Sequence, residues 1–331
     1  MLKAGSYEIR WAVAARFRMR AQGGWAGRGG VAGPAGGEAG PAGGEAGPAG
    51  GEAGGIDRAG RTPTVARVAV IRDGEAAGAG AIVVDAGPGT ASGAAEREAW
   101  GIEEASSLPE ALAWAGIAPD SVARLVLTHL HGDHAGGAAG LSGVPIVVSR
   151  ANLERARGKA GRDGYRLGDL EALERAGPRL QVLDGPGEIA PGIEAWQSDG
   201  HAAGLLGIRV RQEGRVVLFP SDLLPTLSHL RLPGSGEYDE DPARLEAERR
   251  AVVEEALRED AWIFLYHDPR YAAVRLGGTP ERPIVRQAIR SSAASGAGEA
   301  PRTGRGIEHG DHDQEDGRPA EIRAPQPKGT R

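Results

Sequence analysis

Thr128-His129-Leu130-His131-Gly132-Asp133-His134 is the stretch that carries most of the chemical information in this chain. It places three of the chain's eight histidines and one aspartate within six residues, in the pattern H-x-H-x-D-H. Imidazole and carboxylate groups are ligands for divalent metals such as Zn²⁺. The stretch follows the apolar segment 124–127, which predicts a buried strand. A metal site is therefore predicted where a β-strand ends.

Composition narrows the classes of protein to consider. The 331 residues are 40% hydrophobic, enough for one large domain or two small ones. There is no cysteine, which excludes thiolate ligands, disulfides and a cysteine nucleophile. The net charge of −6 argues against a nucleic-acid partner. Because we find neither a secretory signal nor about 18 consecutive apolar residues, we expect a cytoplasmic protein without a membrane partner that acts on a small molecule.

Two segments have biased composition. The heptad Gly-Pro-Ala-Gly-Gly-Glu-Ala occurs three times in tandem from Gly33, and the tail mixes Gly, Pro and charged residues. Neither has the large apolar side chains that would offset the entropy of ordering. We expect four regions: an N-terminal strand region at 1–22, a disordered repeat insertion at 23–60, a catalytic domain at 61–290, and a disordered tail at 291–331.

The catalytic region alternates between strand and helix patterns. Strands are predicted over 66–71, 81–84, 124–127, 145–149, 205–211, 215–219 and 262–266. Helices are predicted over 108–115, 151–157, 169–175 and 242–257. Ser107 and Glu110 have the spacing of a capping box, and Gln212-Glu213-Gly214 indicates a hairpin turn. The interleaving predicts a layered α/β fold with mixed sheets.

Further candidate ligands lie beside other predicted strands. Asp222 follows 215–219, His267 follows 262–266, and His201 precedes 205–211. A histidine alone in a loop is more often structural or solvated, so none of these is informative by itself. Two divalent ions that share one ligand need about seven groups. The chain offers seven: His129, His131, Asp133, His134, His201, Asp222 and His267.

In this order, these residues resemble those of the metallo-β-lactamase superfamily of hydrolases. The resemblance covers about residues 62–275, and more weakly 5–9. It implies a four-layer αββα sandwich of two mixed β-sheets flanked by helices, with the site at one edge between the sheets. It also implies that Asp222 bridges two metals and that Asp85, after the strand 81–84, orients the ligands. The implied ligands are His129, His131 and His201 for the first metal, and Asp133, His134 and His267 for the second.

Within the superfamily, the chain is most similar to the lactonase and organophosphate-hydrolase-like branch. The resemblance is carried by Asp222-Leu-Leu-Pro-Thr226, His229-Leu230, Tyr238-Asp239 and His267-Asp268-Pro269. The lack of cysteine excludes the cysteine-containing β-lactamases, and His131 stands where the flavodiiron branch has Glu.

The chain also departs from this branch. Ser198-Asp199 stands where Thr-Pro usually precedes Gly-His, and Pro225 stands where acyl-homoserine lactonases have a substrate-facing Tyr. The candidates for the substrate pocket are then His229, Tyr238 and Tyr266. Since this branch is often dimeric, the resemblance makes a homodimer the expected assembly.

The predicted activity is hydrolysis at a dinuclear centre, where two divalent ions share and activate a water as a bridging hydroxide. Zn²⁺ is the first choice of metal, with Mn²⁺, Co²⁺ or Fe²⁺ as alternatives. Asp222 and Asp133 are the predicted catalytic carboxylates; the first fixes the metal separation and the second accepts and returns a proton. A lactone or other carboxylic ester is the first choice of substrate. A phosphotriester or phosphodiester is the alternative, and a catalytically idle metal-binding module remains open.

Overall fold

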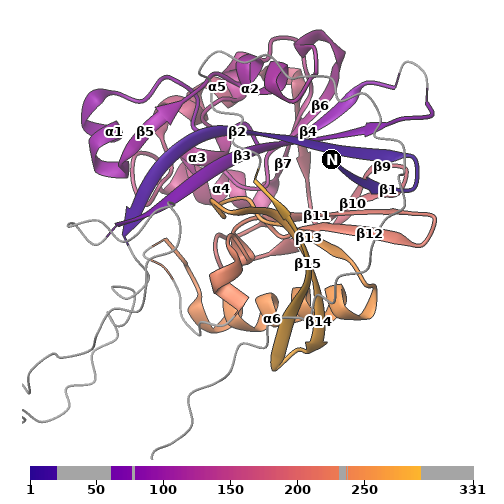
Figure 1. Cartoon of the computed structure of the whole chain (residues 1–331). Helices are drawn as coiled ribbons and strands as arrows, with labels where there is room; N and C mark the ends of the chain where they lie inside the picture. The colour runs from indigo at the N-terminus through magenta and orange to yellow at the C-terminus, as the bar shows by residue number, and fades with distance from the viewer. Residues whose placement is uncertain (21–60, 77–78, 231–235, 237, 292–331) are drawn as a thin grey trace, which may run out of the picture. The chain divides into compact units, whose positions relative to one another are not determined.

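The computed structural model describes residues 1–20, 61–76, 79–230, 236 and 238–291, which all belong to one compact unit. The predicted insertion at 23–60 and all of the predicted tail except Ser291 lie outside these residues. The long strand of the predicted region 1–22, Tyr7–Arg20, pairs directly with Arg61–Asp73, the first strand after the insertion (Figure 1). In the part of the chain that is described, no helix is long and apolar enough to cross a membrane.

The first sheet has eight strands among the described residues, in the order β1-β2-β3-β4-β6-β7-β8, with β5 paired to β2. The pairs from β1 to β4 are antiparallel, and those from β4 to β8 are parallel. The sheet is therefore mixed, as predicted. Its strands are β1 (Leu2–Ala4), β2 (Tyr7–Arg20), β3 (Arg61–Asp73), β4 (Ala81–Val84), β5 (Ile102–Ala105), β6 (Val122–Val126), β7 (Ile146–Ser149) and β8 (Leu180–Leu183).

The second sheet has seven strands among the described residues, in the order β15-β14-β13-β12-β11-β10-β9. Only the β12–β13 pair in this order is parallel. In the predicted turn between β11 and β12, Glu213 and Gly214 both have positive φ, at 51° and 70°, as a type I′ hairpin requires. The strands are β9 (Gly187–Ala190), β10 (Ile193–Ser198), β11 (Leu205–Gln212), β12 (Arg215–Phe219), β13 (Trp262–Phe264), β14 (Tyr271–Thr279) and β15 (Arg282–Arg290).

Six α-helices and five 3-10 helices complete the described part of the chain. The predicted capping box opens α2: the Ser107 hydroxyl accepts from the Glu110 backbone, and the Glu110 side chain accepts from the Ser107 backbone. The α-helices are α1 (Ala94–Trp100), α2 (Leu108–Trp114), α3 (Gly132–Ala135), α4 (Arg150–Gly158), α5 (Leu167–Arg175) and α6 (Pro242–Arg258). The 3-10 helices are η2 (Pro119–Ser121), η3 (Ala138–Gly140), η4 (Gly177–Arg179), η5 (Ser221–Leu223) and η6 (Leu227–Leu230).

These elements form four layers, and an apolar cluster lies at each of the three interfaces between them. Between the sheets, Ile71 and Val126 of the first sheet pack in one cluster with Phe219 of the second. Leu112 belongs to a cluster that joins the outer face of the first sheet to α2, α4 and α5. Val253 of α6 belongs to the cluster on the outer face of the second sheet. The predicted αββα sandwich is confirmed.

The predicted strand 262–266 is shorter in the structure, where β13 ends at Phe264. Beyond this point the carbonyls of Leu265 and Tyr266 accept hydrogen bonds from the Arg67 side chain of β3, at 2.7 and 3.2 Å. The chain therefore turns here, and His267 lies in the turn rather than at the tip of a strand.

Candidate metal centre

The candidate centre lies where strands of both sheets end. Asp85 follows β4, the histidine-rich loop follows β6, and Asp222 follows β12. At two residues near these strand ends the backbone is in the left-handed region, with φ of 61° at Asp85 and 51° at Ser221. Non-glycine residues adopt this conformation at an energetic cost, and such strain is often found at functional sites. The turns at Asp85 and Ser221 direct the side chains that follow the strands toward the candidate centre.

The first group of converging side chains is His129, His131 and His201, all buried. Nε2 of His129 lies 3.0 Å from Nδ1 of His131, which lies 3.2 Å from Nε2 of His201. Three imidazole nitrogens that face one another at this distance offer donors to one cation. The structure thus brings together the three residues predicted for the first metal.

The second group is Asp133, His134 and His267. Nε2 of His134 lies 3.3 Å from Nε2 of His267, which lies 3.4 Å from Oδ2 of Asp133. The two histidines are buried, and Asp133 is partly exposed. This is the set predicted for the second metal, and its nitrogen and oxygen donors also suit a divalent ion.

Asp222 lies between the two groups. Its Oδ1 is 3.3 Å from Nε2 of His267 and 3.4 Å from Nε2 of His134, both in the second group. Its Oδ2 is 3.5 Å from Nε2 of His201, in the first group. Oδ1 is buried without a hydrogen bond of good geometry, despite these short distances. A buried carboxylate oxygen in this condition is costly unless a cation satisfies it.

The outer nitrogens of three histidines have oxygen partners. Nδ1 of His201 lies 2.6 Å from Oδ1 of Asp239, and Nδ1 of His134 lies 3.0 Å from Oδ2 of Asp85. Nδ1 of His267 donates to the carbonyl of Val65 at 2.7 Å. A proton on each Nδ1 leaves the lone pair of Nε2 free to face the centre, as metal-binding histidines require. The donor set therefore fits two divalent cations.

The electrostatics of the ligand set fit the same conclusion. Burial and the neighbouring imidazoles lower the pKa of His129 and His131 well below the ordinary value, so both are neutral donors. Burial alone would raise the pKa of Asp222, but the facing His267 and His134 hold it well below its usual range. Burial opposes a charge on His134, yet Asp222, Asp133 and Asp85 together raise its pKa well above the usual value. The carboxylates thus create a site that attracts positive charge.

The three predicted pocket residues lie near this centre in different ways. Tyr266 is buried, its ring stacks on His134 at 4.0 Å, and its hydroxyl donates to the Asp133 carbonyl at 2.8 Å. His229 is buried with Nδ1 2.8 Å from the Thr226 hydroxyl, and burial lowers its pKa to about 4. The half-buried Tyr238 has its ring 6.0 Å from that of His131. A substrate-facing role for each of them stays a prediction.

Residues 61–267 match the metallo-beta-lactamase superfamily. The chain belongs to this superfamily. An N-acyl homoserine lactonase of Bacillus cereus is 27% identical over 156 residues, which cover 46% of this chain and 58% of that protein. The chain thus spans little more than half the length of this curated relative.

Two solved structures share the fold of this chain. A probable metal-dependent hydrolase from Staphylococcus aureus superposes with a TM-score of 0.72 at 18% identity, covering 89% of this chain and 100% of that one. A dizinc quorum-quenching lactonase superposes with a TM-score of 0.64 at 15% identity, covering 89% and 97%. At such identities the likeness establishes the metallo-beta-lactamase fold alone.

Several residues that support the centre were not found from the sequence. Asp239 belongs to the Tyr238-Asp239 motif, but no local pattern indicates that it contacts His201. Val65 acts through its backbone carbonyl, which no side-chain pattern can reveal. Arg166 contacts the metal loop, which we define as residues 128–136, by donating to the carbonyl of Gly132 at 3.3 Å, and it also donates to the carbonyl of Pro88 at 3.1 Å.

Gly132 is predicted to be intolerant of a side chain. A Cβ at this position would lie 2.1 Å from Cδ of Arg166 and 2.9 Å from the Trp100 ring. Arg166 cannot easily move, because its Nε also pairs with Glu96 at 3.2 Å and Asp169 at 3.1 Å. We expect Gly132→Ala to lower the free energy of unfolding by about 1–3 kcal/mol, as overpacking does. Urea unfolding of the metal-free protein measures this.

Gly158, the last residue of α4, provides the matched control. An added Cβ would meet nothing within 4 Å there. Since alanine is the better helix former, Gly158→Ala should leave stability unchanged or raise it by up to about 1 kcal/mol. Equal stability of Gly132→Ala and the wild type would contradict the tight packing over the metal loop.

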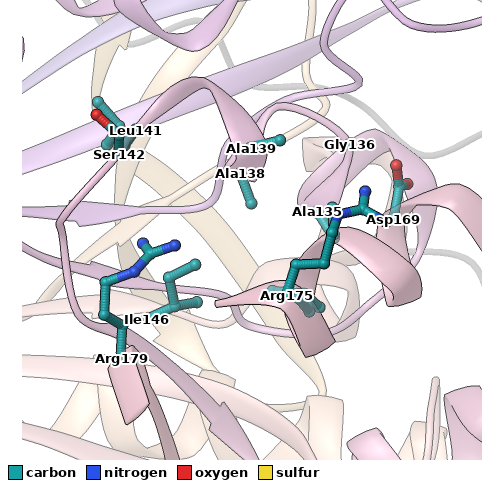
Figure 2. A pocket seen from close by; sticks show the side chains of 12 residues that line it. Ala135, Gly136, Ala138, Ala139, Leu141, Ser142, Ile146, Asp169, Arg175 and Arg179 are labelled. Carbon is teal, nitrogen blue, oxygen red and sulfur yellow. The ribbon is translucent and has the colours of Figure 1, made fainter. Parts of the chain in front are cut away.

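A cavity of about 210 Å³ is separate from the candidate ligands. Figure 2 shows side chains that line it. It is lined mainly by small apolar side chains of α3, η3 and α5, with Asp169, Arg175 and Arg179 adding charge. It reaches the metal loop only at Ala135 and Gly136, and the seven candidate ligands are not among its lining residues. The groups that could perform chemistry therefore gather in the metal centre rather than in this cavity.

Proposed function

We propose that this chain is a dinuclear metal-dependent hydrolase of lactones or other neutral carboxylic esters. The observation that carries the proposal is the position of Asp222. One carboxylate oxygen faces His134 and His267, and the other faces His201. Such a placement suits a ligand shared by two ions, which together lower the pKa of a water and polarise the bond to be cleaved. Zn²⁺ is the first candidate for His and Asp ligands.

The chain's own residues have distinct proposed roles. His129, His131 and His201 would hold the first ion, Asp133, His134 and His267 the second, and Asp222 both. Asp85 and Asp239 would keep the Nε2 atoms of His134 and His201 unprotonated by accepting from Nδ1.

Asp133 and Asp222 are also the proposed catalytic carboxylates. With side chains 17% and 12% exposed, they are more accessible than His134, at 0%, and His267, at 5%. A substrate would therefore approach on the side of these carboxylates. Asp133 would accept a proton during attack and return it to the leaving oxygen.

The metal ions would attract an anionic phosphate as well as an ester carbonyl, so a preference for phosphodiesters would need further cations beside the ligand set. Two cations close to the ligand set are already paired: Arg166 with Glu96 and Asp169, and Lys159 with Asp163 and Glu240. A neutral ester needs no such cation. The lactonase from Bacillus cereus supports the same substrate class, and Tyr238 beside His131 is our candidate for contact with the substrate.

The test is a panel assay of the full chain after loading with Zn²⁺. Lactones of several ring sizes, a nitrophenyl ester, a phosphotriester and a phosphodiester would be compared by kcat/KM. We expect a lactone or carboxylic ester to exceed both phosphoesters by at least about tenfold, which corresponds to 1.4 kcal/mol. A phosphotriester as the best substrate would overturn the substrate proposal. Two bound metals without hydrolysis of any compound would instead support the idle binding module.

A homodimer and a cytoplasmic location also remain proposals. Sedimentation of the purified full chain would decide between monomer and dimer.

A further inference from the structure

A buried arginine of β3 holds the turn that carries His267. Arg67 is 0% exposed. Its Nη1 donates to the carbonyls of Leu265 at 2.7 Å and Tyr266 at 3.2 Å, and its Nη2 donates to the carbonyl of Asp268 at 2.5 Å. All three acceptors lie in the four residues 265–268, directly after the end of β13.

This arrangement is costly and specific. A buried guanidinium loses its hydration, and these three hydrogen bonds of Arg67 go to neutral carbonyls rather than to a carboxylate. Burial lowers the pKa of Arg67 to about 10, so the group is still charged at neutral pH. The planar fork of arginine can hold several carbonyls in fixed directions, which the single ammonium of lysine cannot do. The interaction therefore fixes the geometry of the turn.

The turn reaches each member of the second ligand group. His267 lies within it, and β3 orients its ring through the Val65 carbonyl at 2.7 Å. Tyr266, also in the turn, stacks on His134 and donates from its hydroxyl to the Asp133 carbonyl at 2.8 Å. The first group depends on other contacts, since His201 is held by Asp239 and the others lie in the loop after β6.

We infer that Arg67 is a positioning residue for the second metal ion: it holds the 265–268 turn, and through that turn it sets His267, His134 and Asp133. The inference rests on the proposed function insofar as both ligand groups bind metal, and it is independent of the substrate. The affinity of the second site should depend on Arg67, whereas that of the first site should not.

The test measures metal rather than turnover. The full chains of the wild type, Arg67→Met and Arg67→Lys would be titrated with Zn²⁺ against a chromophoric chelator, which gives the affinity of each site. We expect two sites in the wild type. In both variants we expect one of the two sites to lose about 10- to 100-fold in affinity, as when an outer partner of a ligand is removed, and the other to stay within about twofold.

The two substitutions separate geometry from charge. Lysine keeps the positive charge but lacks the planar guanidinium with its several N–H donors, and methionine lacks both. If the charge of Arg67 mainly repelled the metal, Arg67→Met would bind the second ion more tightly than the wild type. That result would overturn the inference, and so would unchanged or equally weakened affinities at both sites.

Two further variants guard against a general loss of structure. Ile71→Ala removes a side chain of the same strand that is 1% exposed in the core between the sheets, so it should lower stability while both metal affinities stay unchanged. If both Arg67 variants fail to fold, Tyr266→Phe tests the same route, because it removes the link to Asp133. It should weaken only the second site, and equal affinities in Tyr266→Phe and the wild type would then count against the inference. A wild type that binds no Zn²⁺ would refute the proposed function itself.

Discussion

Asp222→Asn is expected to lower kcat/KM for the best ester substrate by at least about a thousandfold, or about 4 kcal/mol of transition-state stabilisation. The two oxygens of Asp222 face different ligand groups, and an amide can offer only one oxygen and no negative charge. The variant keeps the shape of the side chain, so the fold should persist. Steady-state kinetics of the Zn²⁺-loaded variant, with circular dichroism as the check on folding, measures the effect.

Asp163→Asn is the matched control for this substitution. Asp163 is exposed, and its backbone φ of 50° is one that asparagine also tolerates. Its side chain pairs with Lys159 at 3.0 Å rather than with a candidate ligand. The control should keep kcat/KM within about twofold, as expected for a surface ion pair. Near-normal turnover by Asp222→Asn would contradict the proposed role of Asp222 as a shared ligand.

Asp85→Asn is expected to weaken metal binding by about 10- to 100-fold, although Asp85 is not itself one of the candidate ligands. The Asp85 carboxylate is 1% exposed and accepts from the backbone N of Thr128 at 2.8 Å and from its hydroxyl at 2.9 Å. Its second oxygen lies 3.0 Å from Nδ1 of His134. An asparagine amide cannot accept from all three groups, so His134 loses its preferred tautomer or Thr128 loses a partner.

The same variant should also be less stable in the metal-free state. A buried donor left without an acceptor costs about 1–3 kcal/mol. Asparagine tolerates the left-handed backbone at position 85, so strain does not add to this cost. Urea unfolding gives the stability, and chelator competition gives the affinity. Unchanged affinity would show that the His134 ring is held by something other than Asp85.

The candidate ligands could be predicted from the sequence because they are clustered in it or follow apolar strands. His129 and His131 lie in the loop after β6, His134 lies in the short helix α3 that follows directly, and Asp222 comes three residues after β12. Alternation of apolar and polar residues, together with capping and turn residues, predicts such elements well. The sandwich followed from the resemblance, and three separate cores account for it physically.

Other parts of the fold had misleading local signals. The strands β14 and β15 contain Gly277, Gly278 and Pro283, which usually interrupt strands. The structure accommodates Pro283 because β15 is the edge of its sheet, where a missing backbone donor costs little. These segments are strands because β14 pairs with β13 on one side and with β15 on the other, despite the glycines and the proline.

The burial of Arg67 is likewise not predictable from the local sequence. It lies between apolar residues of β3 and looks like the solvent-facing member of an alternating strand. In the structure it is fully buried, because its partners are backbone carbonyls about 200 residues further along the chain. Contacts to backbone atoms depend on tertiary packing, and a single sequence does not encode them in any readable pattern.

The number of metal ions per chain tests the central claim most directly. Native mass spectrometry of the full chain, loaded with Zn²⁺ and then dialysed, counts the ions on each molecule. The two ligand groups joined by Asp222 predict a main species with two ions in the wild type and at most one in Asp222→Ala. A wild type that holds one ion or none at saturating Zn²⁺, or an Asp222→Ala variant that still holds two, would contradict the account.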